Sequence, residues 1–339
     1  MDRETQTRKL NREDREFELP LRPQTLDEFL GQEELCERLR IFIGAAKKRS
    51  ETLGHCILSG PPGLGKTTFA NIIAREMQSN LVLSSGPSIE KAGDLAGILT
   101  NLSDGDVLFI DEIHRLPKSI EEYLYSAMED FSLDLVIDSG PSARSVQVKL
   151  NPFTLIGATT KMGLLSAPLR SRFAMHFRLD FYKREILAKI LRRSSRILNF
   201  SISQDALLAV ASRSRGTPRI ANHLLRWVRD CAQMEGVDVD ALVVDKALKM
   251  LSIDEKGLDE MDKKILNVMI DHYNGGPVGL KTMAMAVGEE SMTLEEVYEP
   301  FLILEGFLQR TPKGRKVTKR AYLHMNRALP ANQQEPIDD

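Results

Sequence analysis

Residues 60–67 read Gly60-Pro61-Pro62-Gly63-Leu64-Gly65-Lys66-Thr67, a complete G-x-x-x-x-G-K-T loop. An apolar run at 55–59 precedes this loop and a helix-patterned stretch at 68–74 follows it, so it joins a predicted strand to a predicted helix. Glycines allow the backbone amides to turn toward a polyphosphate, and the helix N-terminus adds partial positive charge. Lys66 can reach the terminal phosphates, and the Thr67 hydroxyl can ligate Mg²⁺. A chance glycine-rich turn would rarely combine all these features, so we predict a nucleotide site.

The composition is that of an ordinary globular protein. The chain has 339 residues, of which 42% are hydrophobic and 28% charged, and this length suits two or three domains. The net charge of −2 means that any nucleic-acid-binding face must be local. The three cysteines form no C-x-x-C pair, which argues against a zinc knuckle and suits a reducing cytosol. No signal peptide or membrane-spanning run is visible, so we expect a cytoplasmic protein without a membrane partner.

Short apolar runs alternate with helical patterns between residues 55 and 181, which predicts an α/β core with a parallel sheet covered by helices. The predicted strands are 55–59, 81–83, 107–110, 153–156 and 175–181. From residue 183 to about 255 only helical periodicity remains, which predicts a small all-α lid. After Gly257, helical stretches lead to two short strands around a Pro-Lys-Gly turn, a pattern typical of a winged helix.

The expected domains follow from these changes of pattern. They are a flexible N-terminal arm at 1–18, a large α/β domain with the nucleotide site at 19–182, a helical lid at 183–256, a winged-helix domain at 257–329 and a flexible tail at 330–339. Within the large domain, residues 133–150 have the pattern of a β-hairpin in which Val146, Val148 and Leu150 alternate with polar residues. This hairpin could extend the sheet, or it could protrude and offer apolar side chains to a partner.

Two carboxylates end the apolar strand at 107–110. Asp111 is placed to hold Mg²⁺, and Glu112 is placed to polarise an attacking water. A strand that merely ends in acidic residues is common, but its place downstream of the phosphate loop favours the catalytic interpretation. The second carboxylate, and the lack of an N-K-x-D guanine-reading motif, favour ATP over GTP.

Three further residues have a functional and a plain interpretation. Thr160 could orient the lytic water, or it could only cap a turn. Arg172 could be a surface charge, or an arginine finger presented to the nucleotide of a neighbouring subunit, which would require an oligomer. Arg219 could be a surface charge at a helix start, or a second sensor that contacts the γ-phosphate from the same subunit and couples two domains.

A basic stretch lies near the C-terminus. Residues 308–327 contain seven basic side chains and no acidic one. This composition predicts a wing that faces DNA phosphates, with Arg310 and Arg315 as contacts, although a solvated basic face is the alternative. Because no base-reading pattern is present, we expect binding without sequence preference.

Together these motifs resemble the RuvB family of AAA+ ATPases, from about Leu21 to Met325. The separate ATPase motifs occur in many AAA+ proteins, and their combination with a winged-helix ending points to RuvB. The family's usual glycine after the Arg-Phe pair is Ala174 here. The motifs that carry the resemblance, besides the phosphate loop, are Leu21-Arg22-Pro23, Ile110-Asp111-Glu112-Ile113-His114-Arg115-Leu116, Gly157-Ala158-Thr159-Thr160, Leu169-Arg170-Ser171-Arg172-Phe173, Arg215-Gly216-Thr217-Pro218-Arg219 and Gly306 to Arg315.

The resemblance implies an ATP hydrolase and helicase that drives branch migration of Holliday junctions in recombination and repair, with ATP and Mg²⁺ as cofactors. It also implies duplex DNA, RuvA, RuvC and a homo-hexamer ring as partners, with the hairpin contacting RuvA. The residues that match the family's site are Glu112, Lys66, Arg172, Arg219 and Thr160 for catalysis; Leu21, Arg22, Gly63, Leu64, Gly65, Lys66, Thr67, Thr68, Tyr182, Pro218 and Arg219 for the nucleotide; Thr67 and Asp111 for the metal; and Arg310 and Arg315 for DNA.

A second class of function shares every ATPase residue. A clamp loader or initiator would use ATP as a switch on DNA, but a clamp loader would end in a helical collar, and an initiator would read a specific origin. A protein-remodelling chaperone would need an aromatic pore loop, and the sequence offers no persuasive candidate.

Overall fold

The structure is a computed structural model that describes residues 17–137 and 144–329. The expected arm up to residue 16, the tip of the hairpin at 138–143 and the expected tail at 330–339 lie outside the described residues. The chain divides into two units, Met1–Phe200 with Gly216–His223, and Ser201–Arg215 with Leu224–Asp339.

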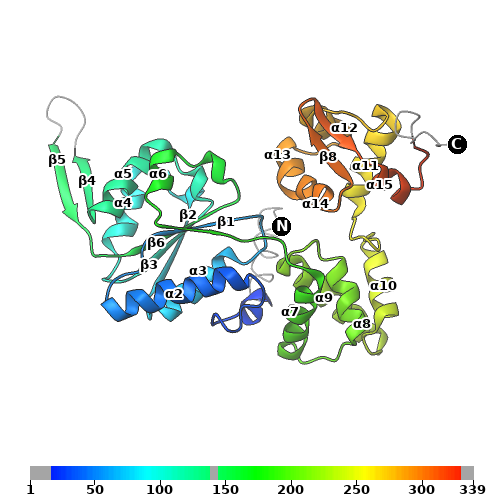
Figure 1. The fold of residues 1–339 in the computed structure, drawn as a ribbon, viewed down its shortest axis with the longest axis horizontal. Helices are drawn as coiled ribbons and strands as arrows, with labels where there is room; N and C mark the ends of the chain where they lie inside the picture. The colour runs from blue at the N-terminus through cyan, green and yellow to red at the C-terminus, as the bar shows by residue number, and fades with distance from the viewer. Residues whose placement is uncertain (1–16, 138–143, 330–339) are drawn as a thin grey trace, which may run out of the picture. The chain divides into compact units, whose positions relative to one another are not determined.

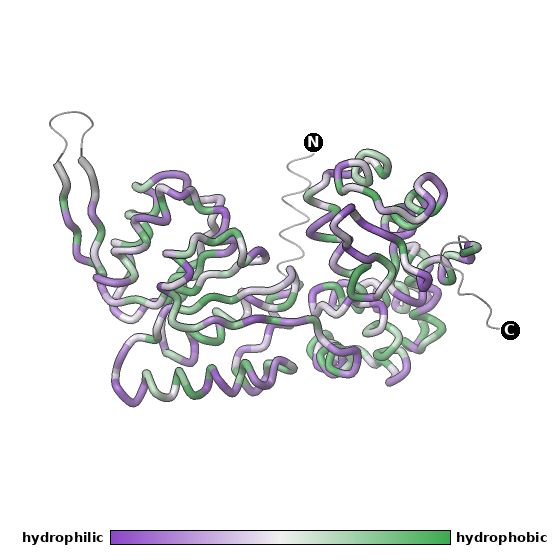
Figure 2. The backbone as a smooth tube through the Cα atoms, turned by 45° about the horizontal axis from the view of Figure 1, so that its top comes forward, coloured by the Kyte–Doolittle hydropathy of each residue, from purple (hydrophilic) through white to green (hydrophobic). Residues whose placement is uncertain are grey.

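The first unit is built on a parallel sheet with the strand order β2-β3-β6-β1-β7 (Figure 1). The strands are β1 (Cys56–Ser59), β2 (Leu81–Ser85), β3 (Val107–Asp111), β6 (Thr154–Thr159) and β7 (Met175–Arg178). The three adjacent strands β3, β6 and β1 are almost wholly buried, as expected for a parallel sheet covered on both faces. Figure 2 shows hydrophobic stretches along these strands, and the predicted α/β core is confirmed.

Helices cover both faces of this sheet. Helices α2 (Glu33–Arg49) and α3 (Lys66–Glu76) lie on one face, and α4 (Ala92–Thr100), α5 (Lys118–Glu129) and α6 (Ala167–Ser171) lie on the other (Figure 1). The apolar stripe predicted after Pro117 is the buried face of α5, and its Leu124 belongs to the same buried core cluster as Phe153 and Leu155. Each such side chain contributes about 1.5–3 kcal/mol when buried. The first unit also contains η1 (Leu19–Leu21), η2 (Gly86–Ser88), η3 (Ile113–Arg115), η4 (Met162–Leu164), α7 (Arg184–Ile197) and the first residues of α9 (Pro218–Glu235).

The hairpin consists of β4 (Ser132–Ile137) and β5 (Arg144–Lys149), which form a separate two-stranded antiparallel sheet. It does not extend the parallel sheet, and it projects beyond α4 and α5 (Figure 1). Leu133 at its base is fully buried, whereas Val146 is 43% exposed. Of the two alternatives for this segment, the structure therefore has the protruding hairpin.

The second unit begins with helices α8 (Gln204–Ser212) and α10 (Ala241–Met250), and it contains the later part of α9 (Pro218–Glu235). Val210 of α8 and Leu248 of α10 are both fully buried. The Trp227 indole donates a 2.8 Å hydrogen bond to the carbonyl of Ala247, which ties α9 to α10. Among the described parts of both units, no helix has the length and apolarity needed to cross a membrane.

The rest of the second unit is the predicted winged helix. Its elements are α11 (Glu260–Tyr273), α12 (Leu280–Val287), α13 (Ser291–Thr293), the π-helical η5 (Leu294–Tyr298), α14 (Glu299–Leu304), β8 (Leu308–Thr311), β9 (Gly314–Val317) and α15 (Lys319–His324). Asp259 caps α11 through a reciprocal capping box with Asp262. Strands β8 and β9 form the wing, and an apolar core that includes Phe301 and Phe307 joins it to the helices.

Candidate active site

The phosphate loop connects β1 to the first turn of α3, and Lys66 is the first residue of that helix. The loop needs glycine for steric reasons at two positions. Gly60 has a φ of 141°, and a Cβ there would collide with the carbonyl oxygen of Leu179. Gly63 has a φ of 79° and lies against Arg219. The loop therefore takes a conformation that L-residues rarely adopt, and it brings backbone amides to the start of α3, where an anion is favoured.

The order of the strands brings the other motifs to the same edge of the sheet. Strand β6 lies between β3, which ends at Asp111, and β1, which leads into the phosphate loop. Because parallel strands end at one edge, the acidic pair, Thr160 and the loop lie side by side. All of them line one pocket.

Lys66 is buried, with 7% of the residue exposed. Burial lowers the pKa of its ammonium, although the charges of Asp111 and Glu112 oppose this effect. The ammonium donates to the carbonyl oxygens of Gly60 and Pro61 at 2.8 and 2.9 Å. A buried cation held by neutral carbonyls beside two carboxylates is well placed to exchange these contacts for phosphate oxygens.

Thr160 offers the clearest sign that the pocket receives a polar ligand. Its Oγ1 is buried and has no hydrogen-bond partner among the described residues. A buried hydroxyl without a partner costs roughly 1–3 kcal/mol, so such groups usually have a function. Thr160 lines the same pocket as Lys66 and Glu112, so a phosphate oxygen or the lytic water would satisfy it.

The opposite side of the pocket suits a base. Leu21 is 4% exposed and Tyr182 is 8% exposed, and both line the pocket with Pro218. The Tyr182 hydroxyl donates to the carbonyl of Leu64 at 3.3 Å, and burial raises the pKa of this phenol. The predicted nucleotide residues found in the lining are Leu21, Arg22, Gly63, Leu64, Gly65, Lys66, Thr67, Thr68, Tyr182, Pro218 and Arg219.

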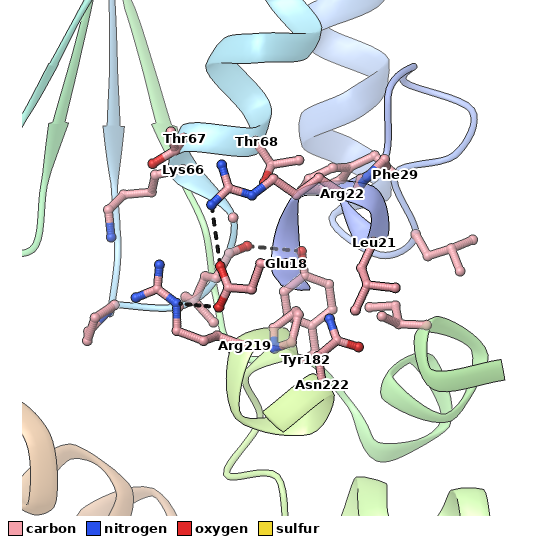
Figure 3. Close-up of a pocket in the computed structure, with 18 of the residues that line it drawn as sticks. Glu18, Leu21, Arg22, Phe29, Lys66, Thr67, Thr68, Tyr182, Arg219 and Asn222 are labelled. Atoms are coloured by element: carbon pink, nitrogen blue, oxygen red, sulfur yellow. Dashed lines mark hydrogen bonds and ion pairs between the residues drawn. The ribbon is translucent and has the colours of Figure 1, made fainter. Parts of the chain in front are cut away.

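Glu18 places an anion in this pocket. Its carboxylate lies 3.3 Å from Arg22 and from Arg219 and 3.5 Å from His223, and it is 15% exposed (Figure 3). Both arginines point toward this carboxylate (Figure 3). The predicted second sensor is therefore engaged by an internal carboxylate in this structure.

The pocket also suits Mg²⁺. The Thr67 hydroxyl and the Asp111 carboxylate, both in the lining, are the hard oxygen donors that this ion prefers. In the part of the chain that the structure describes, no cluster of three or more His, Cys, Asp or Glu side chains could hold a metal ion. Mg²⁺ fits such a site because it usually takes one or two protein ligands and completes its shell with water and phosphates.

Arg172 lies elsewhere on the first unit, and it is not in the pocket lining. It follows α6, and its guanidinium donates to Glu129 at 2.9 Å and to the carbonyl of Pro168 at 2.9 Å. The same group lies over the ring of Tyr125, 4.4 Å from its centroid. Arg172 therefore does not line the nucleotide pocket of its own chain. This position is compatible with a residue that acts on the nucleotide of a neighbouring subunit.

The two predicted DNA contacts, Arg310 and Arg315, face each other across the wing. Both donate to the carboxylate of Glu299, which is 2% exposed, at 3.0–3.2 Å. Arg315 is only 13% exposed, whereas Arg310 is 53% exposed. The structure therefore places Arg310 at the surface and buries much of Arg315.

Several pocket residues are absent from the set of site residues that the sequence predicts, although Pro23 and Pro62 lie within quoted motifs. They are Glu18, Pro23, Glu28, Phe29, Leu30, Pro62, Ile190, Arg193 and Asn222. Glu18 was expected to end the flexible arm, yet residues 17 and 18 are helical. Its position just before Leu21-Arg22 was the only available signal.

Comparison with known proteins gives matches to family profiles between residues 21 and 326. The family profile described as "Holliday junction DNA helicase RuvB P-loop domain" matches residues 21–179. The RuvB AAA lid domain matches residues 182–254, and the RuvB C-terminal winged helix domain matches residues 255–326.

Individual relatives are similar over most of their length. The Holliday junction branch migration complex subunit RuvB of Protochlamydia amoebophila is 66% identical over 317 residues, which cover 93% of this chain and 96% of that protein. Its counterpart in Salinibacter ruber is 56% identical over 97% of this chain and 96% of that protein. The solved Thermotoga maritima RuvB Holliday junction branch migration motor superposes with a TM-score of 0.85 at 50% identity, covering 92% of this chain and all of that one. The chain therefore belongs to the RuvB family of Holliday junction branch migration motors.

Proposed function

We propose that this chain is the ATP-driven subunit of a ring that moves duplex DNA through a Holliday junction. The observation that carries the proposal is the pocket of the first unit. It brings together the phosphate loop, the Asp111-Glu112 pair and the unpartnered hydroxyl of Thr160. The same chain also contains a winged helix. A site of this kind hydrolyses ATP, and the wing offers arginine to a DNA backbone.

In the proposed reaction, each residue acts on the triphosphate or on the attacking water. Lys66 would exchange its contacts with Gly60 and Pro61 for phosphate oxygens, and Glu112 would orient the water and accept its proton. Thr67 and Asp111 would hold Mg²⁺, which when bound neutralises charge on the phosphates. Arg219 would stabilise the developing charge from the same subunit.

We further propose that Arg172 completes the site of the neighbouring subunit. An arginine held at a surface by Glu129 and Tyr125, away from its own pocket, fits this role. The proposal requires an oligomer, and we infer the homo-hexamer typical of this family. Duplex DNA, RuvA and RuvC are the proposed partners, with the β4–β5 hairpin offering Val146 to RuvA. Three free cysteines suit the reducing cytoplasm as the place of action.

The replacement Glu112→Gln tests the chemistry. It keeps the shape of the side chain and removes the base, so ATP binding should persist while hydrolysis falls by about 100-fold or more. A labelled nucleotide would measure binding, and phosphate release would measure turnover. The matched control is Glu122→Gln, which changes an exposed carboxylate on α5. Normal turnover by the Glu112→Gln variant would refute the assigned base.

A further inference from the structure

His114 is a buried imidazole beside the proposed base. It lies in η3, the short helix that follows β3, and its side chain is 6% exposed. One ring nitrogen, Nε2, lies 3.4 Å from Oε2 of Glu112. The other, Nδ1, lies 2.9 Å from the hydroxyl of Thr159 at the end of β6. The ring thus joins the catalytic carboxylate to the strand that leads into Thr160.

The partners of the ring fix the direction of these contacts. An ionised carboxylate only accepts hydrogen bonds, so Nε2 must carry the proton that faces Glu112. In the neutral ring, Nδ1 then accepts from the Thr159 hydroxyl. The Thr159 oxygen in turn accepts from the backbone amide of Lys161 at 3.0 Å. Each group donates to the next, from Lys161 through Thr159 and His114 to Glu112.

The backbone of Glu112 is already fixed, whereas its carboxylate is not. Glu112 has a left-handed φ of 49°, its carbonyl accepts from the Arg115 amide at 2.8 Å, and its amide donates to Asp111 at 3.0 Å. Gly86 packs so closely on the same carbonyl that a Cβ there would collide with it. The Glu112 side chain, however, is 32% exposed. His114 supplies the contact on the carboxylate itself.

We propose that His114 is a positioning residue that holds the Glu112 carboxylate in its working orientation, and that Thr159 anchors the ring. This inference rests on the proposed role of Glu112 as the base. The contact at 3.4 Å is long for a hydrogen bond, but catalytic contacts often tighten only in the reacting complex. Thr159 and Thr160 are neighbours at the end of β6. Thr159 anchors His114, and Thr160 presents its unpartnered hydroxyl to the pocket.

Two amide replacements of His114 separate positioning from simple packing. In His114→Gln, the amide nitrogen can take the place of Nε2 and still donate to Glu112. In His114→Asn, the shorter side chain can reach Thr159 but not Glu112. A poorly oriented base should slow hydrolysis without weakening nucleotide binding, so kcat for ATP hydrolysis and the Kd of a labelled ATP analogue are measured for both full-length variants, together with their thermal midpoints.

We expect His114→Asn to lower kcat by about 10-fold or more, with Kd and thermal midpoint unchanged, and His114→Gln to stay within about 3-fold of the parent. Unchanged hydrolysis by His114→Asn would overturn the proposal. Faster hydrolysis would also overturn it, because His114 would then restrain the base rather than orient it. Equal losses in both variants, with a lower midpoint, would show a purely structural ring and would also overturn it.

Glu112→Gln, assayed in parallel, keeps the two proposals apart. If Glu112→Gln hydrolyses ATP normally, the proposed base is wrong and this inference falls with it. If Glu112→Gln is inactive while His114→Asn matches the parent, only the positioning role fails. In the double variant, His114→Asn should cause no loss beyond that of Glu112→Gln, because both act through one carboxylate.

Discussion

Glu18 brings a negative charge into the nucleotide pocket, next to Arg22 and Arg219. Burial acts to raise the pKa of its carboxyl, but a hydrogen bond with His223 and the charges of Arg219 and Arg22 outweigh this effect and lower it. The carboxylate is therefore ionised at neutral pH, next to the predicted second sensor. If Arg219 acts as the proposed second sensor, an incoming triphosphate has to compete with Glu18 for it.

Removing this competitor should strengthen nucleotide binding. We expect Glu18→Gln to tighten ATP binding by about 2–5-fold, because Arg219 is 55% exposed and a partly exposed ion pair contributes at most about 1 kcal/mol. Calorimetric titration with a slowly hydrolysed ATP analogue would measure the change. Glu28→Gln is the control, since Glu28 lies in the same pocket but pairs with Arg193. Weaker binding by Glu18→Gln would mean that Glu18 contacts the nucleotide directly.

Residues in local motifs could be predicted from sequence, and residues defined by distant partners could not. Lys66 and the Asp111-Glu112 pair follow from short patterns at strand ends, and all three lie in the pocket. His114 stood within a quoted motif, but its partner Thr159 is 45 residues away. Only the pairing of β6 between β3 and β1 makes that contact visible.

At the scale of secondary-structure elements, α5 and α6 hold the proposed finger, because Arg172 contacts Glu129 and Tyr125 of α5 and the carbonyl of Pro168 in α6. Arg172→Ala should reduce hydrolysis by about 1,000-fold, the usual contribution of an arginine finger. Because the finger acts on a neighbour, a mixture of Arg172→Ala and Lys66→Ala subunits should recover some turnover, measured as phosphate release. If no ratio of the two variants recovers activity, the shared site is contradicted.

The wing presents one exposed arginine and one that is largely buried. Arg310→Ala should weaken DNA binding at every sequence and reduce the slope of log affinity against log salt by about 1, because one phosphate contact is lost. Arg315→Ala should also lower the thermal midpoint, since it leaves the buried Glu299 with one partner fewer. Fluorescence anisotropy over a salt series measures the DNA affinity and its slope for both variants, and thermal unfolding measures the midpoint. An unchanged slope for Arg310→Ala would remove Arg310 from the interface.

Asp262, in the first turn of α11, should make the free energy of unfolding of the winged helix depend on pH. Burial raises the pKa of Asp262 from its ordinary 3.8 to about 7, even though Arg215 lies 2.6 Å away. The folded unit therefore binds a proton that the unfolded chain releases, and the resulting stabilisation is complete below about pH 4 and lost as the pH rises through about 7.

We expect the thermal midpoint of the winged-helix transition to fall between about pH 5 and pH 8, and this fall to be smaller in Asp262→Asn. Scanning calorimetry of the full chain would record it. Asp271→Asn, an exposed site on the same helix, is the control and should keep the parent's dependence. An identical pH profile for Asp262→Asn and the parent would exclude Asp262 as the source.

Element types were predictable because apolar runs and helical stripes are local, but element ends depended on pairing. The pattern ended a strand at residue 156, whereas β6 continues to Thr159 because Gly157, Ala158 and Thr159 pair with β1. Conversely, the strand predicted over 175–181 ends at Arg178, where the pairing with Ser59 of β1 ends. Pairing partners far along the chain set both limits.

At the scale of the whole molecule, the nucleotide pocket and the wing belong to different units of one chain. The family profiles cover both units from residue 21 to residue 326. A motor must therefore convert hydrolysis in the first unit into DNA movement that involves the second. The proposed ring would be held by contacts between chains, so the local motifs of one chain do not predict it.

Strand exchange on a synthetic four-way junction tests this central claim most directly. The parent protein and Glu112→Gln would each be assayed with RuvA, ATP and Mg²⁺, and without RuvA or ATP as controls. We expect the parent to dissociate the junction only with ATP, most efficiently with RuvA, and Glu112→Gln to bind ATP but to leave the junction intact. Hydrolysis of ATP by the parent without any junction movement under these conditions would contradict the account and would favour an ATP-controlled switch on DNA.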